Sequence, residues 1–283
     1  MKVGIVGLGF VGSALSEGLK SSANIIKIDP KLKTDISDLI KHKPEIVFIC
    51  VPTPMNNNGD QDISIVMDVI DNIRKYNKDL LLVLKSTVLP NYLSELMDRY
   101  DNLVLNPEFL REEFAAEDFI NSKTIIFGGH KNNCLKVSNF YKEHAKCSHK
   151  EHIFTDEISA SLIKYTINSF LALKVVFFNE LQNIFQKSGT VTEWNDFIDA
   201  VSSDKRIGSS HMQVPGPDGR YGFGGPCFPK DTNALLQYSR DLKEEFTLLK
   251  KAININNNIR AQYNDLTLRE KEQNINFKKK IEE

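Results

Sequence analysis

Cys227 lies in a segment whose composition favours the presentation of a thiol to a ligand. Residues 221–231 read YGFGGPCFPKD, so three glycines and a proline precede the cysteine and Asp231 follows it by four residues. Glycine lets a backbone bend sharply or approach a ligand closely, and proline restricts the chain around it. A helical pattern at 231–239 puts the thiol near a helix N-terminus and near Lys230, a setting that favours a nucleophile over an inert buried cysteine.

Two pairs of polar side chains have the spacing of neighbours on a helix. Lys164 and Asn168 are four residues apart in a mostly apolar segment, so both would lie on one side of a helix. They are either surface groups or a pair of donors that face a ligand. Glu108 and Glu112, in the segment NPEFLRE, would also share a face if that segment were helical. An ordinary charged helix start is an equally good interpretation of this second pair.

A glycine-rich segment near the N-terminus is typical of a dinucleotide site. It reads GLGFVG, follows an expected strand and opens a helical pattern, and Asp29 comes at the end of the next expected strand. The glycines allow a tight turn and close approach to a pyrophosphate at the helix N-terminus, and the carboxylate would bind ribose hydroxyls. A carboxylate repels a 2′-phosphate, so NAD is favoured over NADP. The expected cofactor-binding residues here are Gly7, Gly9, Phe10, Val11, Gly12 and Asp29.

The elements that would position these groups alternate in the first half of the chain. Apolar runs, each expected to be a strand, occur at 2–7, 24–29, 45–51, 80–85, 103–106 and 124–128. Helical patterns such as 62–76 separate them, which indicates a mostly parallel sheet. Ligands bind beyond the carboxyl ends of such strands. The polar turns there add Val51, Pro52, Thr53, Ser86 and Thr87 to the expected cofactor contacts.

The second half of the chain has a helical pattern. Residues 156–187 contain neither proline nor glycine, with an N-cap signal at Thr155–Asp156 and a stop at Gly189. A helix of about 30 residues spans about 45 Å and would join two domains or form a subunit interface. A second long helical stretch is expected at 243–280, with a highly charged end. The predicted fold is α/β, a Rossmann-type doubly wound sheet at 1–155 followed by an all-helical central domain at 156–283.

Composition limits the classes of function. The 283 residues carry 36 Lys and Arg against 37 Asp and Glu, a net charge of −1, so neither nucleic acid nor a membrane surface is an expected partner. The N-terminus lacks the features of a signal peptide, and no run of about 18 apolar residues occurs. A cytoplasmic location is therefore expected. The four cysteines form no CxxC pair and the histidines show no metal-ligand spacing, so no metal site is predicted.

These motifs, in this order, resemble the UDP-glucose and GDP-mannose 6-dehydrogenase family. The matching pieces run from residue 3 to about residue 235 and are GLGFVG, VPTP, KSTV, NPEFLRE, KxxxN, RIG and GFGGPCFPKD. The resemblance implies a four-electron oxidation with two NAD, in which a sugar C6 alcohol becomes an aldehyde and then an acid. UDP-glucose is the expected substrate, and a homodimer through the long helices is the expected assembly.

The resemblance also implies roles for individual residues. Cys227 would attack the aldehyde, giving a thiohemiacetal and then a thioester that water hydrolyses. Lys164 and Asn168 would stabilise the oxyanion. Asp231 with Thr87 and an ordered water would manage protons. Glu112, which with Lys230 also belongs to the cofactor contacts, would assist hydrolysis. The substrate contacts implied in this way are Glu108, Phe109, Leu110, Arg111, Lys164, Asn168, Arg206, Arg220, Phe223, Gly224, Gly225 and Cys227.

The chain departs from the family at its C-terminal end. Family members normally continue into a third domain that binds much of the nucleotide, whereas this sequence ends at Glu283, so a shortened form is expected in which Arg220 and His211 contact phosphate. One alternative is an NAD-binding scaffold or an incomplete enzyme that needs a partner domain. Another is a two-electron β-hydroxyacid-type dehydrogenase, although a single hydride transfer needs no thiol at Cys227.

Overall fold

The computed structural model of the chain describes residues 1–56, 59–147, 151–278 and 281. The chain divides into two compact units. The first comprises residues 1–53 and 61–164, and the second comprises residues 54–60 and 165–283.

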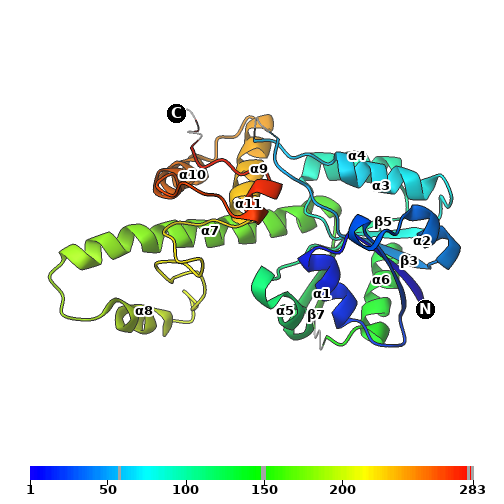
Figure 1. Ribbon diagram of the computed structural model, residues 1–283, viewed down its shortest axis with the longest axis horizontal. Helices are drawn as coiled ribbons and strands as arrows, with labels where there is room; N and C mark the ends of the chain where they lie inside the picture. Colours follow the sequence, from blue (N-terminus) through cyan, green and yellow to red (C-terminus); the bar gives the residue numbers. More distant parts are fainter. Residues whose placement is uncertain (57–58, 148–150, 279–280, 282–283) are drawn as a thin grey trace. The chain divides into compact units, whose positions relative to one another are not determined.

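The first unit contains a sheet of seven described strands in the order β2-β1-β3-β4-β5-β6-β7 (Figure 1). Strands β1 to β5 are parallel, β6 is antiparallel to β5, and β7 is parallel to β6. Their bounds are β1 Lys2–Val6, β2 Asn24–Ile28, β3 Ile46–Ile49, β4 Leu81–Leu84, β5 Leu103–Leu105, β6 Thr124–Gly128 and β7 Glu151–Thr155. The six predicted strands are confirmed, and β7 is an additional edge strand that the sequence analysis did not predict.

Helices cover both faces of this sheet (Figure 1). In β3, Ile46 and Phe48 pack on one face, and Val47 and Ile49 pack on the other, as the twofold alternation of a strand requires. The first face is covered by α1 Phe10–Gly18, α5 Ala115–Asn121 and α6 Lys131–His144. The second is covered by α2 Ile36–His42, α3 Ser64–Arg74 and α4 Pro90–Arg99. The doubly wound Rossmann-type fold is therefore confirmed.

The second unit consists of helices joined by loops. The bounds are α7 Glu157–Lys187, α8 Trp194–Ser202, α9 Phe228–Asp241, α10 Thr247–Arg260 and α11 Leu268–Glu272. Within this unit, α8 lies on the opposite side of α7 from α9 and α10 (Figure 1). The predicted long helix corresponds to α7, which enters the unit's core through Ala172 and Val176.

The division between the units falls inside α7 rather than at the predicted boundary after residue 155. The first turns of α7 pack on the sheet, because Ala160 lies in the core beneath it and Ser161 donates a buried hydrogen bond of 2.6 Å to the Val88 carbonyl. The helix is thus one continuous element with turns in each unit.

The prediction of one long helix over 243–280 is wrong. Helix α10 ends at Arg260 and α11 begins after Thr267. Thr267 and Glu270 form a reciprocal capping box, in which the Glu270 amide donates to the Thr267 hydroxyl at 3.2 Å and the Thr267 amide donates to the Glu270 carboxylate at 2.8 Å. This local signal starts a new helix, as capping boxes do. Glu270 is fully buried and Ile275 and Phe277 join a core cluster, so these residues of the tail belong to the core of the unit.

Helix α7 is long and apolar enough to cross a membrane by length and composition. In the structure, 44% of its most apolar stretch is buried. Several of its polar side chains make buried contacts within the second unit. Asn168 donates to Asp231 at 2.6 Å, and Gln182 donates to the Val214 carbonyl at 3.1 Å. Buried hydrogen bonds of this kind are typical of a core helix in a folded unit.

Candidate active site

The glycine-rich turn after β1 packs so closely on its neighbours that a side chain at Gly7 or Gly12 would clash with backbone atoms. Gly7 has a φ of +89°, and a Cβ on it would lie 2.7 Å from the Cys50 carbonyl oxygen. A Cβ on Gly12 would lie 2.0 Å from the Gly7 carbonyl oxygen. Gly9 is the N-cap of α1, and a Cβ there would meet no described atom within 4 Å. The turn therefore leaves room for a ligand at a helix N-terminus, which fits a pyrophosphate.

Asp29 joins this turn to the end of β2. The side chain is 8% exposed, and its carboxylate accepts hydrogen bonds from the backbone amides of Leu8 at 2.7 Å and Lys31 at 2.9 Å. A carboxylate has about four acceptor positions, so these two bonds leave capacity for ribose hydroxyls. Together with the glycine turn, Asp29 gives the first unit the donor and acceptor set that an NAD molecule needs.

The polar turns after β3 and β4 are joined by hydrogen bonds. The Thr53 hydroxyl and the Gln61 amide both donate to the Thr87 carbonyl, at 2.9 and 2.8 Å, and the Ser86 hydroxyl donates to the Val51 carbonyl at 2.7 Å. The structure thus brings together the predicted residues of both turns. The hydroxyls of Thr53 and Ser86 already bind backbone oxygens, so their observed contribution is to fix the shape of these turns.

Lys164 forms a buried ion pair with Glu108. Its Nζ lies 3.1 Å from Glu108 Oε1 and 2.6 Å from the Glu108 carbonyl oxygen, and the two side chains are 5% and 6% exposed. The Leu110 amide donates to the other carboxylate oxygen at 2.6 Å, and the Phe109 ring centroid lies 5.3 Å from Nζ. Residues 106–111 are not helical, so the condition under which Glu108 and Glu112 would share a helix face is not met. Loss of either charge would leave the other buried and unpaired.

The neighbouring charged residues of this segment are exposed. Glu112 begins the 3₁₀ turn Glu112–Phe114 at the surface. The Arg111 guanidinium pairs with Asp118 at 2.6 Å, and this contact holds the pKa of the Asp118 carboxyl below its usual value. Arg111 is therefore engaged within the first unit.

A buried lysine network that the sequence analysis missed fixes the start of the NPEF segment. Lys85 Nζ donates to the side-chain and backbone oxygens of Asn106 at 3.1 and 3.2 Å. The Tyr141 hydroxyl donates to the same side-chain oxygen at 2.7 Å, and Asn106 donates to the Ile126 carbonyl at 2.8 Å. Burial lowers the pKa of Lys85 and raises that of Tyr141. The sequence signal that could have predicted this network is Lys85 itself, a lysine that directly follows a fully apolar strand.

In the second unit, Cys227 is the N-cap residue of α9. Its carbonyl accepts the first hydrogen bond of the helix, from the Asp231 amide at 2.8 Å. The Asp231 side chain lies within the first turn of α9 and is 1% exposed, so it is inside the unit. Its two oxygens contact Asn168 Nδ2 at 2.6 Å and Lys230 Nζ at 2.5 Å. A thiol, a buried carboxylate and Lys230 thus lie along the first turn of α9, and Asn168 of α7 contacts the carboxylate.

The remaining predicted substrate residues of this unit are already engaged. Phe223 is buried in the core, and Arg206, whose side chain is 89% exposed, pairs with Asp204 at 2.5 Å. Arg220 makes two contacts of 2.9 Å with the carboxylate of Asp265, so it is neutralised within the unit. The predicted phosphate contact of Arg220 would require that pair to open. His211 lies against Phe228, with ring centroids 5.4 Å apart.

The other three cysteines lie in settings that suppress reactivity. The four cysteines, all in the described part of the chain, are thiols. Burial raises the pKa of Cys50 to about 12 and the pKa of Cys134 and of Cys147 to about 11. A raised pKa keeps these thiols neutral near pH 7, and a neutral thiol is a poor nucleophile.

Comparison with known proteins gives matches over both halves of the chain. Residues 27–145 match the NAD-binding domain of the UDP-glucose/GDP-mannose dehydrogenase family, and residues 158–258 match its central domain. The UDP-glucose 6-dehydrogenase of Rickettsia felis is 36% identical over 253 residues, which cover 86% of this chain and 53% of the relative. The chain therefore spans about half the length of the curated relatives it matches.

Two solved structures extend this comparison. A UDP-glucose dehydrogenase from the archaeon Pyrobaculum islandicum is similar with a TM-score of 0.74 and 25% identity, over 90% of this chain and 67% of the other. The 3-hydroxyisobutyrate dehydrogenase of Mycobacterium tuberculosis has a TM-score of 0.70 at 16% identity, over 94% of this chain and 95% of the other. At 16% identity, the match to the mycobacterial enzyme shows a shared fold and nothing about function.

Proposed function

Because the chain belongs to the UDP-glucose/GDP-mannose dehydrogenase family, we propose that it oxidises the C6 hydroxyl of a nucleotide sugar, UDP-glucose first among them, to the acid. The observation that carries this proposal is Cys227 at the N-terminus of α9, one turn before the buried Asp231. A thiol can hold an aldehyde as a thiohemiacetal for a second oxidation. The relative in Rickettsia felis carries the name UDP-glucose 6-dehydrogenase.

Each residue of the candidate site has a chemical task in this proposal. NAD, when bound by the glycine turn and Asp29, supplies the oxidising power for both oxidations. The thiolate of Cys227 adds to the aldehyde carbon to form a thiohemiacetal, whose oxidation leaves a thioester. Lys164 and Asn168 donate hydrogen bonds to the oxygen that becomes negative in these steps. Water then cleaves the thioester, which releases the acid and restores the thiol.

Proton transfers fall to the carboxylates and to Thr87. The buried Asp231 carboxylate, held by Asn168 and Lys230, accepts the proton of the C6 hydroxyl with Thr87 and a water. Glu112, which is exposed, assists the attack of water on the thioester. Glu108 pairs with Lys164 and so holds in place the ammonium that would stabilise an oxyanion.

Two other functions agree with the fold. A two-electron β-hydroxyacid-type dehydrogenase has the same architecture, as the mycobacterial likeness illustrates, and fold alone does not decide function. Such an enzyme needs no thiol, so the position of Cys227 at the N-terminus of α9 favours the four-electron reaction instead. An NAD-binding scaffold, or an enzyme that needs a partner domain, would keep cofactor binding without turnover.

The test is to count NADH formed per molecule of sugar. The purified chain is incubated with NAD and, in separate reactions, UDP-glucose, GDP-mannose or UDP-N-acetyl sugars, with the sugar limiting. The proposal expects two NADH per sugar and an acidic product. One NADH per sugar with an aldehyde or ketone product would support a two-electron enzyme. NAD binding without NADH from any of these sugars would support the scaffold or the incomplete enzyme.

A homodimer through α7 is part of the proposal. Phe170, Phe177 and Ile184 recur every seven residues along α7, and they are 65%, 61% and 66% exposed. Such spacing places them in one stripe along the helix, and a stripe of large apolar side chains is typical of a helix that packs on a partner.

In sedimentation velocity, the native chain is expected to be a dimer, and the double variant Phe170→Lys/Phe177→Lys is expected to be a monomer. The matched control is Leu248→Lys, at an exposed apolar position of α10. A native monomer, or association only with membranes, would contradict the proposal.

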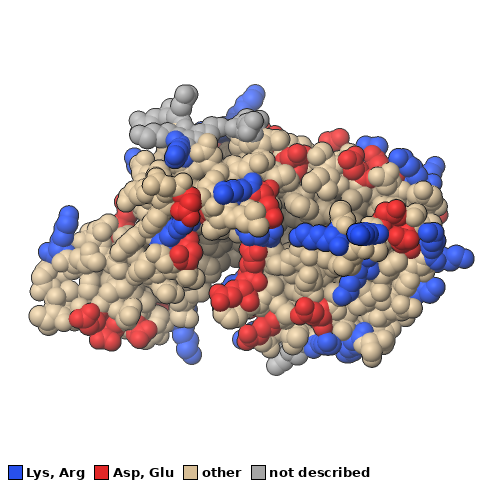
Figure 2. Space-filling model, in the orientation of Figure 1, with Lys and Arg blue, Asp and Glu red and all other residues tan. Residues whose placement is uncertain are grey.

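The distribution of charge agrees with an enzyme that has no nucleic-acid partner, and we propose a cytoplasmic location for it. On the face shown in Figure 2, basic and acidic side chains are intermingled. With a net charge of −1, this mixture gives little long-range attraction for a polyanion. The nucleotide sugar and NAD are therefore the ligands that we propose.

A further inference from the structure

The backbone that leads to Cys227 is held by buried side chains from other helices. The Gly222 amide donates to Asn179 Oδ1 at 2.9 Å, and the Phe223 amide donates to Asn256 Oδ1 at 2.6 Å. The Gly225 amide donates to Glu270 Oε1 at 3.0 Å. Three of the five residues before the nucleophile therefore bond to side chains of α7, α10 and α11, and the last of these bonds is two residues from the thiol.

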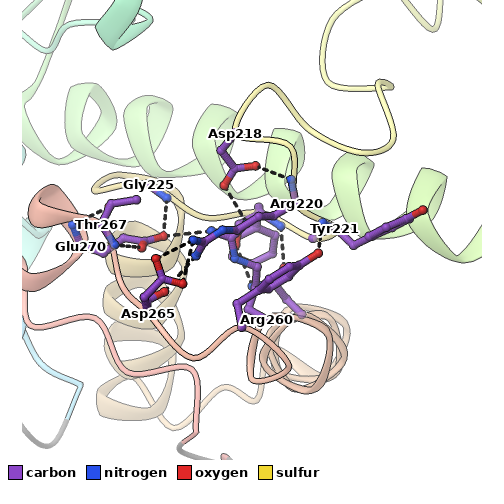
Figure 3. A network of polar contacts seen from close by, with 12 residues as sticks. Asp218, Arg220, Tyr221, Gly225, Arg260, Asp265, Thr267 and Glu270 are labelled. Atoms are coloured by element: carbon purple, nitrogen blue, oxygen red, sulfur yellow. Dashed lines mark hydrogen bonds and ion pairs between the residues drawn. The ribbon is translucent and has the colours of Figure 1, made fainter.

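Glu270 uses its two oxygens for two different tasks (Figure 3). Oε1 accepts from the Gly225 amide at 3.0 Å and from Arg260 Nη2 at 3.0 Å. Oε2 accepts from the Thr267 amide at 2.8 Å, which closes the capping box of α11. One buried carboxylate thus ties the start of the C-terminal helix to the loop that carries Cys227.

Arg260 fills the space that the glycines of this loop leave. It is 2% exposed, and a Cβ on Gly224 would lie 2.0 Å from its Nη2 and 2.7 Å from Glu270 Oε1. Its Nη1 donates to Asp218 at 2.8 Å, at the other end of the same loop (Figure 3). The guanidinium therefore contacts the backbone of the loop closely and pairs with a carboxylate on either side.

We propose that Glu270 and Arg260 are positioning residues for Cys227, so that the C-terminal segment 261–277 takes part in the reaction at the thiol. The inference rests on the proposed function, because it assumes chemistry at Cys227. A hydrogen bond to Gly225 fixes the backbone two residues before the N-cap of α9, and small displacements of a nucleophile lower the rate strongly. A buried ion pair is by itself weak evidence for stability, so the contact to the loop is the more specific role.

The test compares three substitutions of Glu270 with a matched control. Glu270→Ala removes the acceptor, Glu270→Asp keeps the charge but shortens its reach, and Glu270→Gln keeps an oxygen that can accept from Gly225. The control is Glu272→Gln, at a partly exposed position that pairs with Arg269 on the same helix. We expect Glu270→Ala to lower kcat about tenfold with KM changed less than about twofold, and Glu270→Gln to stay within about threefold of native kcat.

A second readout needs neither NAD nor sugar. Iodoacetamide labelling of Cys227, followed by mass spectrometry, is expected to be about tenfold slower in Glu270→Ala, because the thiol is no longer held at the helix N-terminus. This readout remains informative if the native chain oxidises none of the sugars tested, so failure of the proposed function and failure of this inference are distinguishable. Far-UV circular dichroism establishes that each variant is folded, and Glu270→Asp replaces Glu270→Ala if the latter is not.

Two results would overturn the inference. In one, folded Glu270→Ala or Glu270→Asp labels Cys227 at the native rate. In the other, Glu270→Gln is slowed as much as Glu270→Ala, which would show that the charge paired with Arg260, and not the bond to Gly225, governs the thiol. The positioning role is supported if Glu270→Gln keeps the native rate while Glu270→Ala and Glu270→Asp lose it. If Glu270 served only as a charge partner, Glu270→Asp would keep the rate and Glu270→Gln would lose it.

Discussion

Replacement of Cys227 by alanine is expected to lower steady turnover at least about 1,000-fold, because the aldehyde then has no thiol to hold it for a second oxidation. The first oxidation does not need the thiol, so a single turnover is expected to yield up to one NADH for each molecule of UDP-glucose. The measurement is NADH absorbance with the protein in excess over UDP-glucose, followed by steady-state assays at low protein concentration. Trapping of an aldehyde with a hydroxylamine reagent identifies the arrested product.

Cys147→Ala is the control for this substitution. Cys147 is half-buried and packs on the core of the first unit, and burial raises the pKa of its thiol to about 11. Its replacement is expected to leave turnover within about twofold of native, because a neutral thiol contributes nothing as a nucleophile. Steady turnover of Cys227→Ala near the native rate would instead show a two-electron dehydrogenase.

The sheet could be predicted from local patterns because its central strands are continuous apolar runs. Strand β3, for example, is buried at every residue, as a strand covered on both faces must be. Strand β7, of sequence EHIFT, is a partly exposed edge strand, and its mixed composition gives no such signal. The second long helix was predicted over 243–280 because helical spacing continues through it, whereas the capping box at Thr267 divides it.

The candidate site could be predicted only where its residues stand in motifs. Cys227, Asp231, Lys164 and Asn168 were predicted by type and spacing, and two of them, Asn168 and Asp231, are in contact. The partner of Lys164 was not predicted, because that contact joins residues 56 positions apart. The same holds for the bond from Gly225 to Glu270, which spans 45 positions. Pairings of this range depend on the packing of whole elements, which periodicity within a segment does not report.

Substitution of Lys164 by methionine is expected to act on rate and stability through separate contacts. Loss of one oxyanion donor lowers kcat by about 100- to 1,000-fold in comparable sites. In addition, Glu108 is left as a buried carboxylate without its cation, which costs about 3–5 kcal/mol of unfolding free energy. Rates come from NADH formation, and stability comes from urea unfolding followed by circular dichroism.

The double variant Lys164→Met/Glu108→Gln separates these two effects. Glutamine removes the unpaired charge while its oxygen can still accept from the Leu110 amide, so most of the lost stability is expected to return. Turnover is expected to remain about 100-fold or more below native, because the ammonium that stabilises the oxyanion is still absent. If the double variant regained turnover along with stability, Lys164 would serve only to neutralise Glu108, and the proposed oxyanion role would be wrong. Recovery of stability alone would assign the rate loss to the chemistry of the lysine, since the fold would then be intact without it.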